Sequence, residues 1–516
     1  MNANLEIELK FLVPDAARAR RAAELAGRGT PPRRVWLTAA YLDTPDLRLA
    51  QAGLAWRLRR EGGRWVQALK SASRSGLERF EHEVLRPDGR PDPAAHAGTG
   101  PGDQLIALLA QARAEGLEAG VRFQTQVRRL TRRVRTRGAV VDIALDDGRL
   151  LAGGEPQRLR ELEFELVSGS PVAMLALAER WRQRHGLLLD PRNKAERGHL
   201  LAAGEPHPPL RKARPPAYAK NAPVPEALGA VLDECLAHLG RNLIGLAVGD
   251  PERRVEHVHQ ARVAIRRLRS ALRAFRGWAP EPPAELVDGL RALFAALGAT
   301  RDRDVLASGV AAALARAGAP PLALPADASA PDPAALARHG DTQRLLLSWW
   351  GWRAGLALPG AVAAPAVARA PGTAPEDEVG GEISSAAPAL KRLARQRLRR
   401  WHKGLVASCR AFDELDDEAL HDLRKRVKRQ RYVFECFAPL LPAKPAARHL
   451  QALAAAQEQL GEINDLSVAR SRYQALVATD PAAWFAVGWL TARLAELRAG
   501  AREDMARLAA VEALPR

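Results

Sequence analysis

The chain has 516 residues, which is too long for one hydrophobic core and predicts two to four domains. Its 78 Lys and Arg against 59 Asp and Glu give a formal net charge of +19, so the candidate partners are polyanions: nucleic acid, anionic membranes and polyphosphate. Three cysteines, Cys235, Cys409 and Cys436, form no CxxC pair, which excludes a disulfide framework and a thiolate zinc site.

The first ten residues carry charges where a signal peptide would be apolar. The longest apolar stretch, 345–368, is interrupted by Arg353, Pro359 and Pro365, so it does not read as a membrane span. The sequence therefore predicts a cytoplasmic protein without a transmembrane segment.

The alternation of residues divides the chain. Residues 1–203 contain short segments in which apolar and charged residues alternate, a pattern that predicts strands. Residues 204–225 are rich in proline and charge and are predicted to form an exposed linker. In 226–515 apolar residues recur three and four apart, which predicts helices. We expect an α+β multidomain protein.

The helical part contains an internal repeat. The segment HQARVAIRRLRSALRAF, beginning at His259, aligns without gaps with HDLRKRVKRQRYVFECF, beginning at His421. The two copies lie in repeats of about 226–370 and 385–515, and each is predicted to form a four-helix bundle.

The first predicted strand carries its charges on one face. Glu6, Glu8 and Lys10 alternate with aliphatic residues, and the same pattern recurs at 55–59, 79–83 and 161–166. If these faces point outward, they are an ordinary solvated surface. However, carboxylates two residues apart repel each other unless a cation is bound. Closing the strands into a barrel would place a carboxylate patch beside an Arg and Lys patch, which suits a triphosphate complexed with Mg²⁺ or Mn²⁺.

These segments resemble a known family. The ExExK opening, the Tyr41-Leu-Asp43-Thr44 segment, the Arg57-x-Arg59 pair, the ELEFEL strand and the Lys194-Ala-Glu-Arg-Gly segment occur in the order found in the CYTH domain of the triphosphate tunnel metalloenzymes. The resemblance covers about residues 1–203. It implies an eight-stranded antiparallel β-barrel tunnel that hydrolyses or cyclises a triphosphate with a divalent metal. One departure is Asn193, where the family often has Ser before the lysine.

The resemblance also implies residue roles. Glu6, Glu8 and Lys10 would be the catalytic residues of the opening motif. With Asp146 added from the charged face of the strand VVDIALD, the predicted metal ligands are Glu6, Glu8, Asp146, Glu161, Glu163 and Glu165. The predicted substrate-binding cations are Lys10, Arg57, Arg59, Lys70, Arg129, Arg133 and Lys194.

Each repeat of the helical part carries a row of basic residues at helical spacing. The first row is His259, Arg262, Arg266, Arg269 and Arg273, and the second is His421, Arg424, Lys428 and Arg431. One such row is usually a solvated face, but two related rows could merge into one groove. His259 and His421 are not spaced from other His or Cys residues as metal ligands would be, so we expect them to have a structural role.

The paired His-x-x-Arg helices, each followed by an LGxxxD segment, resemble the CHAD domain over roughly 226–515. This resemblance implies that the two rows bind inorganic polyphosphate, and the order of barrel then helices is typical of such fusions. Glu435 stands where the second row would place its last arginine, so we expect weaker binding at that end.

Together these features predict a triphosphatase that acts on inorganic triphosphate or a similar short polyphosphate, with the helices binding long polyphosphate, including polyphosphate granules. Three alternatives stay open: an adenylate cyclase or thiamine triphosphatase using the same tunnel, a non-catalytic polyphosphate scaffold, and nucleic-acid binding. The last is disfavoured, since the chain has no RNP or zinc-finger pattern and few aromatics among the basic rows.

Overall fold

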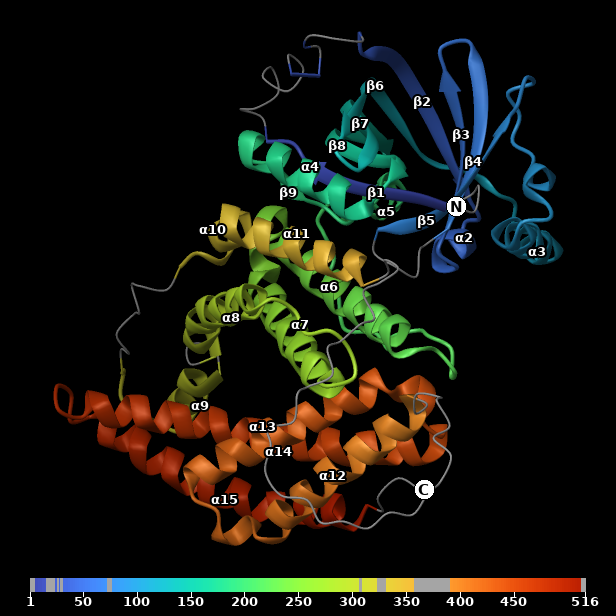
Figure 1. Cartoon of the computed structure of the whole chain (residues 1–516). Helices are drawn as coiled ribbons and strands as arrows, with labels where there is room; N and C mark the ends of the chain where they lie inside the picture. The colour runs from blue at the N-terminus through green and yellow to red at the C-terminus, as the bar shows by residue number, and fades with distance from the viewer. Residues whose placement is uncertain are drawn as a thin grey trace, which may run out of the picture.

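The computed structural model describes residues 5–14, 24–25, 27, 31–71, 77–305, 309–322, 331–356 and 390–511, apart from the side chains of 155 and 300–305. Within these ranges the chain forms a β-barrel followed by a helical region. Figure 1 shows the barrel at the top, the first helical repeat in green and yellow below it, and the second repeat in orange and red at the bottom.

The barrel is a closed antiparallel sheet. Its eight main strands follow the order β5-β4-β3-β2-β6-β7-β8-β1, and pairing of β1 with β5 closes the ring. The two-residue strand β9 adds to the end of β1. The strands are β1 (Leu5–Leu12), β2 (Arg33–Asp43), β3 (Leu54–Glu61), β4 (Arg64–Ser71), β5 (Glu78–Leu85), β6 (Gly120–Thr136), β7 (Ala139–Ala152), β8 (Glu155–Gly169) and β9 (Leu188–Leu189). The predicted antiparallel eight-stranded barrel is confirmed.

The alternation of apolar and charged residues along β1 determines which side chains point into the barrel. Leu9 and Phe11 are buried in the core outside the ring, where the Phe11 and Phe164 rings meet edge to face with centroids 5.7 Å apart. Trp181 of α4 (Pro171–His185) covers Phe164 from outside. Because side chains alternate along a strand, the charged residues between these apolar ones face the barrel interior.

Three further helices belong to the barrel region: α2 (Arg48–Gln51), α3 (Gly100–Ala114) and α5 (Lys194–Ala202). The Asn193 Oδ1 accepts a hydrogen bond from the backbone N–H of Glu196 at 2.8 Å and so caps α5, as a serine would do. Gly198 lets α5 lie flat on the barrel, since a Cβ there would lie 2.1 Å from the Phe123 ring.

The helical region has two parts. The first contains α6 (Val224–Val248), α7 (Arg254–Phe275), α8 (Ala284–Val305), α9 (Ala311–Arg316), α10 (Pro333–Arg338) and α11 (Gly340–Gly355). The second contains α12 (Leu390–Arg410), α13 (Asp417–Cys436), α14 (Ala443–Leu476) and α15 (Ala483–Ala510). The predicted boundary between the repeats, 370–385, lies outside the described residues. In the described part of the chain no helix is long and apolar enough to cross a membrane.

The proline-rich segment 204–225 was expected to be exposed, and this expectation is wrong in part. The backbone N–H of Arg214 donates to Glu234 of α6 at 2.7 Å, and the Tyr218 hydroxyl donates to the carbonyl of Cys436 at 2.7 Å. The segment therefore runs along α6 and reaches the end of α13. These two hydrogen bonds join the segment to the helix that directly follows it, α6, and to α13, which lies far away in the sequence.

The barrel and the helical region share one hydrophobic core. Helix α4 packs against α11, and the backbone N–H of Leu189 donates to Gln343 Oε1 at 2.8 Å. The buried cluster extends without a break from Phe164 to Trp350 and on to the second repeat. The two parts are thus held together by buried apolar surface as well as by polar contacts.

Candidate functional site

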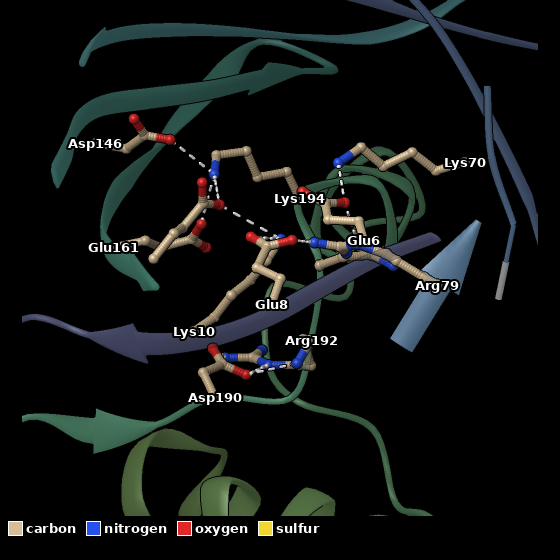
Figure 2. A network of polar contacts seen from close by, with 12 residues as sticks. Glu6, Glu8, Lys10, Lys70, Arg79, Asp146, Glu161, Asp190, Arg192 and Lys194 are labelled. Atoms are coloured by element: carbon tan, nitrogen blue, oxygen red, sulfur yellow. Dashed lines mark hydrogen bonds and ion pairs between the residues drawn. The ribbon is translucent and has the colours of Figure 1, made fainter. Parts of the chain in front are cut away.

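The centre of the barrel interior is organised around one lysine. The Lys194 Nζ lies 2.8 Å from Asp146 Oδ2, 2.8 Å from Glu161 Oε2 and 2.6 Å from Glu163 Oε1. Figure 2 shows the Lys194 ammonium between Asp146 and Glu161. The side chains of Lys194 and Glu163 are only 8% and 9% exposed. Helix α5 and strands β7 and β8 thus bring together residues that lie far apart in the sequence.

Arginines complete this central network. The Arg129 guanidinium donates to Asp146 Oδ1 from Nε at 2.7 Å and to Glu163 Oε2 from Nη2 at 2.5 Å. The Arg197 Nη1 donates to Glu161 Oε1 at 2.6 Å. Each of the three carboxylates therefore faces at least two cations.

A second group lies where β1 meets β4 and β5. The Lys70 Nζ and the Arg79 Nε lie 2.9 Å and 3.0 Å from Glu6 Oε2, and Arg79 also pairs with Glu8. The Lys10 Nζ lies 3.2 Å from Glu8 Oε1 and 3.4 Å from Glu163 Oε1. Lys10 thus links this group to the central network. Figure 2 shows Glu6, Glu8 and Lys10 together along β1.

The third group lies on β3 and β5. The Arg57 Nη2 donates to Glu81 at 3.3 Å, and the Arg59 Nη2 donates to Glu83 at 3.0 Å. In contrast, the Nε atoms of Arg57 and Arg59 are buried and have no hydrogen-bond acceptor among the described residues. Buried donors normally have acceptors, so these two guanidiniums can each take a further anionic oxygen.

The ion pairs set the protonation states. Burial alone would raise the pKa of Glu163, but Lys194, Arg129 and Lys10 hold it well below its usual range. Burial opposes the charge of Lys194, yet Asp146, Glu161 and Glu163 raise the pKa of its ammonium. Glu163 and Lys194 therefore both keep their charges near neutral pH.

Glu165 is the exception. Its carboxylate forms no ion pair with the other described residues, and the side chain is exposed to solvent at the end of the β8 row. Loss of part of its solvent shell, together with the negative charges of Glu6, Glu81 and Glu163, raises the pKa of Glu165 to about 7. This is a point at which another positive charge would relieve repulsion.

One predicted tunnel residue lies away from these groups. The Arg133 side chain is 59% exposed and pairs with Asp142 at 2.8 Å, so it lies at the rim of the barrel. All the other predicted interior residues, from Glu6 to Lys194, join the three groups above or lie beside them.

Sequence reasoning missed four interior residues: Arg79, Glu81, Glu83 and Arg197. The sequence pattern at 79–83, a strand with its charges on one face, indicates that three of them share a face. Arg197 lies three residues after Lys194, and this helical spacing places both side chains on the same face of α5.

The Asp43-Thr44 segment has a different role. The Asp43 carboxylate accepts hydrogen bonds from the backbone N–H groups of Thr44, Leu49 and Ala50 at 2.7–2.9 Å. It is fully buried and fixes the turn from β2 into α2. Asp43 therefore supports the barrel wall and does not line the interior.

The interior suits a hard divalent cation in its donor chemistry, since it offers carboxylate oxygens. The unrelieved repulsion at Glu165 is consistent with such an ion. In the described ranges, however, no three acidic, histidine or cysteine side chains are grouped as ligands. The carboxylates are instead held by Lys and Arg, so a metal would have to replace some of these ion pairs.

The two basic rows of the helical region come together. Helices α7 and α13 pack against each other, and the Arg266 Nε lies 3.4 Å from the Tyr432 hydroxyl. Burial and the positive charges of Arg424, Arg266 and Arg431 lower the pKa of Lys428 to about 7. Cations from both repeats therefore surround one half-buried lysine, as the repeated spacing predicted.

The rest of the first row lies against α8. The guanidinium carbons of Arg262, Arg266 and Arg269 lie 4.4 Å, 5.9 Å and 6.0 Å from the centroid of the Phe294 ring. Cation–π contacts of this kind hold the row in place without neutralising it. Arg273 lies one turn further along the row. Burial and the positive charge of Arg273 together lower the pKa of Arg429 on α13.

Polar contacts hold the second row. The Arg424 Nη2 lies 3.6 Å from Asp465, and the His421 Nδ1 lies 2.7 Å from Asn464 Oδ1. At the far end Glu435 pairs with Arg267 and, at 3.6 Å, with Arg431. Glu435 thus neutralises part of the row at the end where its sequence position predicted weaker binding.

Comparison with known proteins agrees with this geometry. Residues 4–199 match the CYTH domain family, and residues 230–474 match the CHAD domain family. An inorganic triphosphatase of Haemophilus influenzae is 28% identical over 173 residues, which are 33% of this chain and 47% of that protein. The chain thus spans about half the length of that relative.

Two solved structures are also similar. The crystal structure of the CHAD domain from the plant Ricinus communis is 30% identical, covers 60% of this chain and 99% of its own, and gives a TM-score of 0.44. The PH1819 protein of Pyrococcus horikoshii is 19% identical, covers 39% of this chain and 99% of its own, and gives a TM-score of 0.24. On the two family matches, the chain contains a CYTH domain followed by a CHAD domain.

Proposed function

We propose that the CYTH domain hydrolyses inorganic triphosphate or a similar short polyphosphate with Mg²⁺ or Mn²⁺. One observation carries this proposal: a closed barrel holds carboxylates and cations together, and two of its buried guanidiniums, those of Arg57 and Arg59, have Nε donors without an acceptor among the described residues. A phosphate chain supplies those acceptors, and the carboxylates suit the accompanying metal.

Phosphate binding and metal binding would fall to two different sets of residues in the barrel. Lys10, Arg57, Arg59, Lys70, Arg129 and Lys194 would hold the phosphate oxygens, with Arg133 at the rim. Glu6, Glu8, Asp146, Glu161, Glu163 and Glu165 would hold a divalent metal, which supplies Lewis-acid neutralisation of phosphate charge when it is bound. A carboxylate of β1 or β8 would orient a water for in-line attack on the terminal phosphorus. The bond from that phosphorus to the bridging oxygen breaks, and orthophosphate and pyrophosphate leave.

A phosphate-release panel tests the activity. Purified protein is assayed with inorganic triphosphate, ATP, thiamine triphosphate and long-chain polyphosphate, each with Mg²⁺ or Mn²⁺. We expect the fastest release from inorganic triphosphate and none without metal. Cyclic nucleotide formed from ATP would identify a cyclase, preferred thiamine triphosphate a thiamine triphosphatase, and no turnover of any substrate a non-catalytic scaffold.

We further propose that the CHAD domain binds long-chain inorganic polyphosphate, which would also recruit the protein to polyphosphate granules in the cytoplasm. The supporting observation is the cluster of Arg266, Arg424 and Arg431 around Lys428, with the remaining row residues, His259, Arg262, Arg269, Arg273 and His421, continuing from it. Nucleic acid is the competing ligand. If duplex or single-stranded nucleic acid displaced polyphosphate at equal phosphate concentration, the selective assignment would fail.

We propose domain limits of 1–203 and 226–515, joined by 204–225. The matched family ranges lie within these limits, and α5 ends at Ala202. Limited proteolysis of the full chain tests this. The segment 204–225 is anchored to α6, so cleavage there should be slower than in a free linker.

A further inference from the structure

The first helix of the second repeat carries an unusual charge. Helix α12 contains eight basic residues and no acidic residue: Lys391, Arg392, Arg395, Arg397, Arg399, Arg400, Lys403 and Arg410. Its counterpart in the first repeat, α6, carries one arginine against three carboxylates, Glu226, Asp233 and Glu234. The two helices hold the same place in their bundles, so the fold itself does not require the positive charge of α12.

The charge is gathered on the outer face of α12. The buried face consists of Leu390, Ala394, Leu398, His402, Leu405 and Cys409. At 100° per residue, Arg392, Lys403 and Arg410 fall in one line on the opposite side, with Arg400 beside them. These four side chains are exposed, and no carboxylate of the described residues forms an ion pair with Arg392, Arg400 or Lys403. The row is therefore an open cationic surface.

This surface continues into the α7–α13 cluster. The Arg397 guanidinium lies 3.8 Å from the Trp278 ring centroid and donates to the carbonyl of Ala274, at the end of α7, at 2.6 Å. Burial and the positive charge of Arg400, one turn away on the same helix, lower the pKa of Arg397. On the α13 side Arg429 lies 5.2 Å from the Trp401 ring centroid and close to Arg273 of the first row. Cations thus lead from Arg273 across Arg429 and Arg397 to Arg400.

We propose that the outer face of α12 is a second binding segment that holds the continuation of a polyphosphate chain leaving the α7–α13 cluster. This rests on the proposed polyphosphate binding by the CHAD domain. A linear polyanion fits because the cations repeat along the helix. Their arrangement would not recognise a particular base sequence. Nucleic acid fits less well, since guanidiniums already cover the Trp278 and Trp401 faces on which bases would stack.

The proposal predicts dependence on chain length. Short polyphosphate should bind at the α7–α13 cluster alone, and only long polyphosphate should reach α12 as well. In the full-length triple variant R392Q/R400Q/K403Q, we expect short-chain affinity to be unchanged and long-chain affinity to fall at least tenfold. If all three side chains contact phosphate, the slope of log K against log salt for the long chain should decrease in magnitude by about 2.

The controls separate this proposal from the proposed function. R344Q/R502Q/R507Q removes the same net charge from exposed arginines that pair with Asp341, Asp413 and Asp504, and it should leave both affinities unchanged. R424Q/K428Q should weaken both chain lengths.

The remaining outcomes distinguish failure of the α12 proposal from failure of the proposed function. If R392Q/R400Q/K403Q binds long chains like the unmodified protein while R424Q/K428Q does not, the α12 segment is wrong and the proposed function stands. If the unmodified protein binds no polyphosphate, both fail. If single-stranded RNA displaces the long chain from the unmodified protein but not from R392Q/R400Q/K403Q, α12 is a nucleic-acid surface and the proposal is overturned.

Discussion

Arg241 of the CHAD domain holds Glu196 of the CYTH domain through two hydrogen bonds. The Arg241 Nη2 donates to Glu196 Oε2 at 2.7 Å, and Nη1 donates to the other carboxylate oxygen. Glu196 lies on α5 between Lys194 and Arg197, whose side chains enter the barrel. The CHAD domain thus anchors α5, the helix that carries the interior cations Lys194 and Arg197.

We expect Arg241→Gln to lower both the stability of the protein and its proposed phosphate release, because the change leaves Glu196 with an unpaired charge and loosens α5. The expected loss in the free energy of unfolding is about 1–3 kcal/mol. A double-mutant cycle with Glu196→Gln, measured by denaturant unfolding and phosphate release, should show that the two effects are not additive. Arg291→Gln is the control, since its pair with Asp288 is exposed and lies within α8 of the helical region. Additive effects would show that the pair is not coupled.

Glu8→Gln should abolish most phosphate release while leaving the fold intact. The amide keeps the shape of the side chain but removes the charge that faces Lys10 and Arg79. We expect a decrease in kcat on the order of 100-fold or more. The matched control is Glu115→Gln, which loses an exposed pair with Arg48. Near-normal turnover in Glu8→Gln, with an unchanged circular dichroism spectrum, would refute its assignment.

Gly198→Ala should push α5 away from the barrel. The new methyl group would overlap the Phe123 ring, which is itself stacked on Tyr41 with centroids 4.4 Å apart and has no room to move. Overpacking of this kind costs about 1–3 kcal/mol. Thermal melting and phosphate release should both decrease. Gly500→Ala, on an open helical face, should instead be neutral or stabilising by about 1 kcal/mol.

Polyphosphate binding should weaken as the pH rises through the neutral range. The pKa of Lys428 is lowered to about 7 in the free protein, and a bound anion would raise it again. Binding then takes up a proton above pH 7, so affinity falls with rising pH until the pKa of the bound state is passed. Calorimetric titration in buffers of different ionisation enthalpy measures this uptake. Lys428→Arg should bind without it, and proton uptake that persists in this variant would assign it to another group.

Metal binding to the barrel should release protons below about pH 7. The pKa of Glu165 is raised to about 7, so the carboxyl is largely protonated in mild acid and must ionise to coordinate a cation. The folded state therefore binds more protons than the unfolded chain between pH 4.5 and 7, and without metal its stability falls slightly as pH rises through that window. Solvent screens this exposed group, so the stability change is small. Glu165→Gln should remove the proton release on titration with Mn²⁺, and equal release in both proteins would exclude Glu165 as a ligand.

Alternation in the sequence predicted strands with one charged face, and the resemblance to the CYTH domain implied that eight such strands close into a barrel. Alternation places Glu6 and Glu8 on one face whatever the neighbours are, and burial of Leu9 and Phe11 outside the ring then turns that face inward. Which carboxylate meets which cation could not be predicted. Those pairs depend on the stagger of eight strands and on how α5 packs against β6 and β7.

The helical region was predicted in a similar way. The repeat and the spacing of its basic rows were visible in the sequence, and the meeting of Arg266 with Lys428 followed once α7 packed on α13. The anchoring of the proline-rich segment was not visible, because proline and charge without periodicity look the same whether the chain is free or bound. Its partners, Glu234 and Cys436, lie on helices formed later in the chain.

The uninterrupted core between the two domains has a consequence for how this architecture can change. Leu187, Leu188 and Leu189 beside the barrel lie in the same buried cluster as Leu346, Leu347 and Trp350 of the helical region. Separating the domains would expose these side chains to water, with a cost that grows with the apolar area uncovered. Either domain produced alone would therefore present this apolar surface to water and should tend to aggregate.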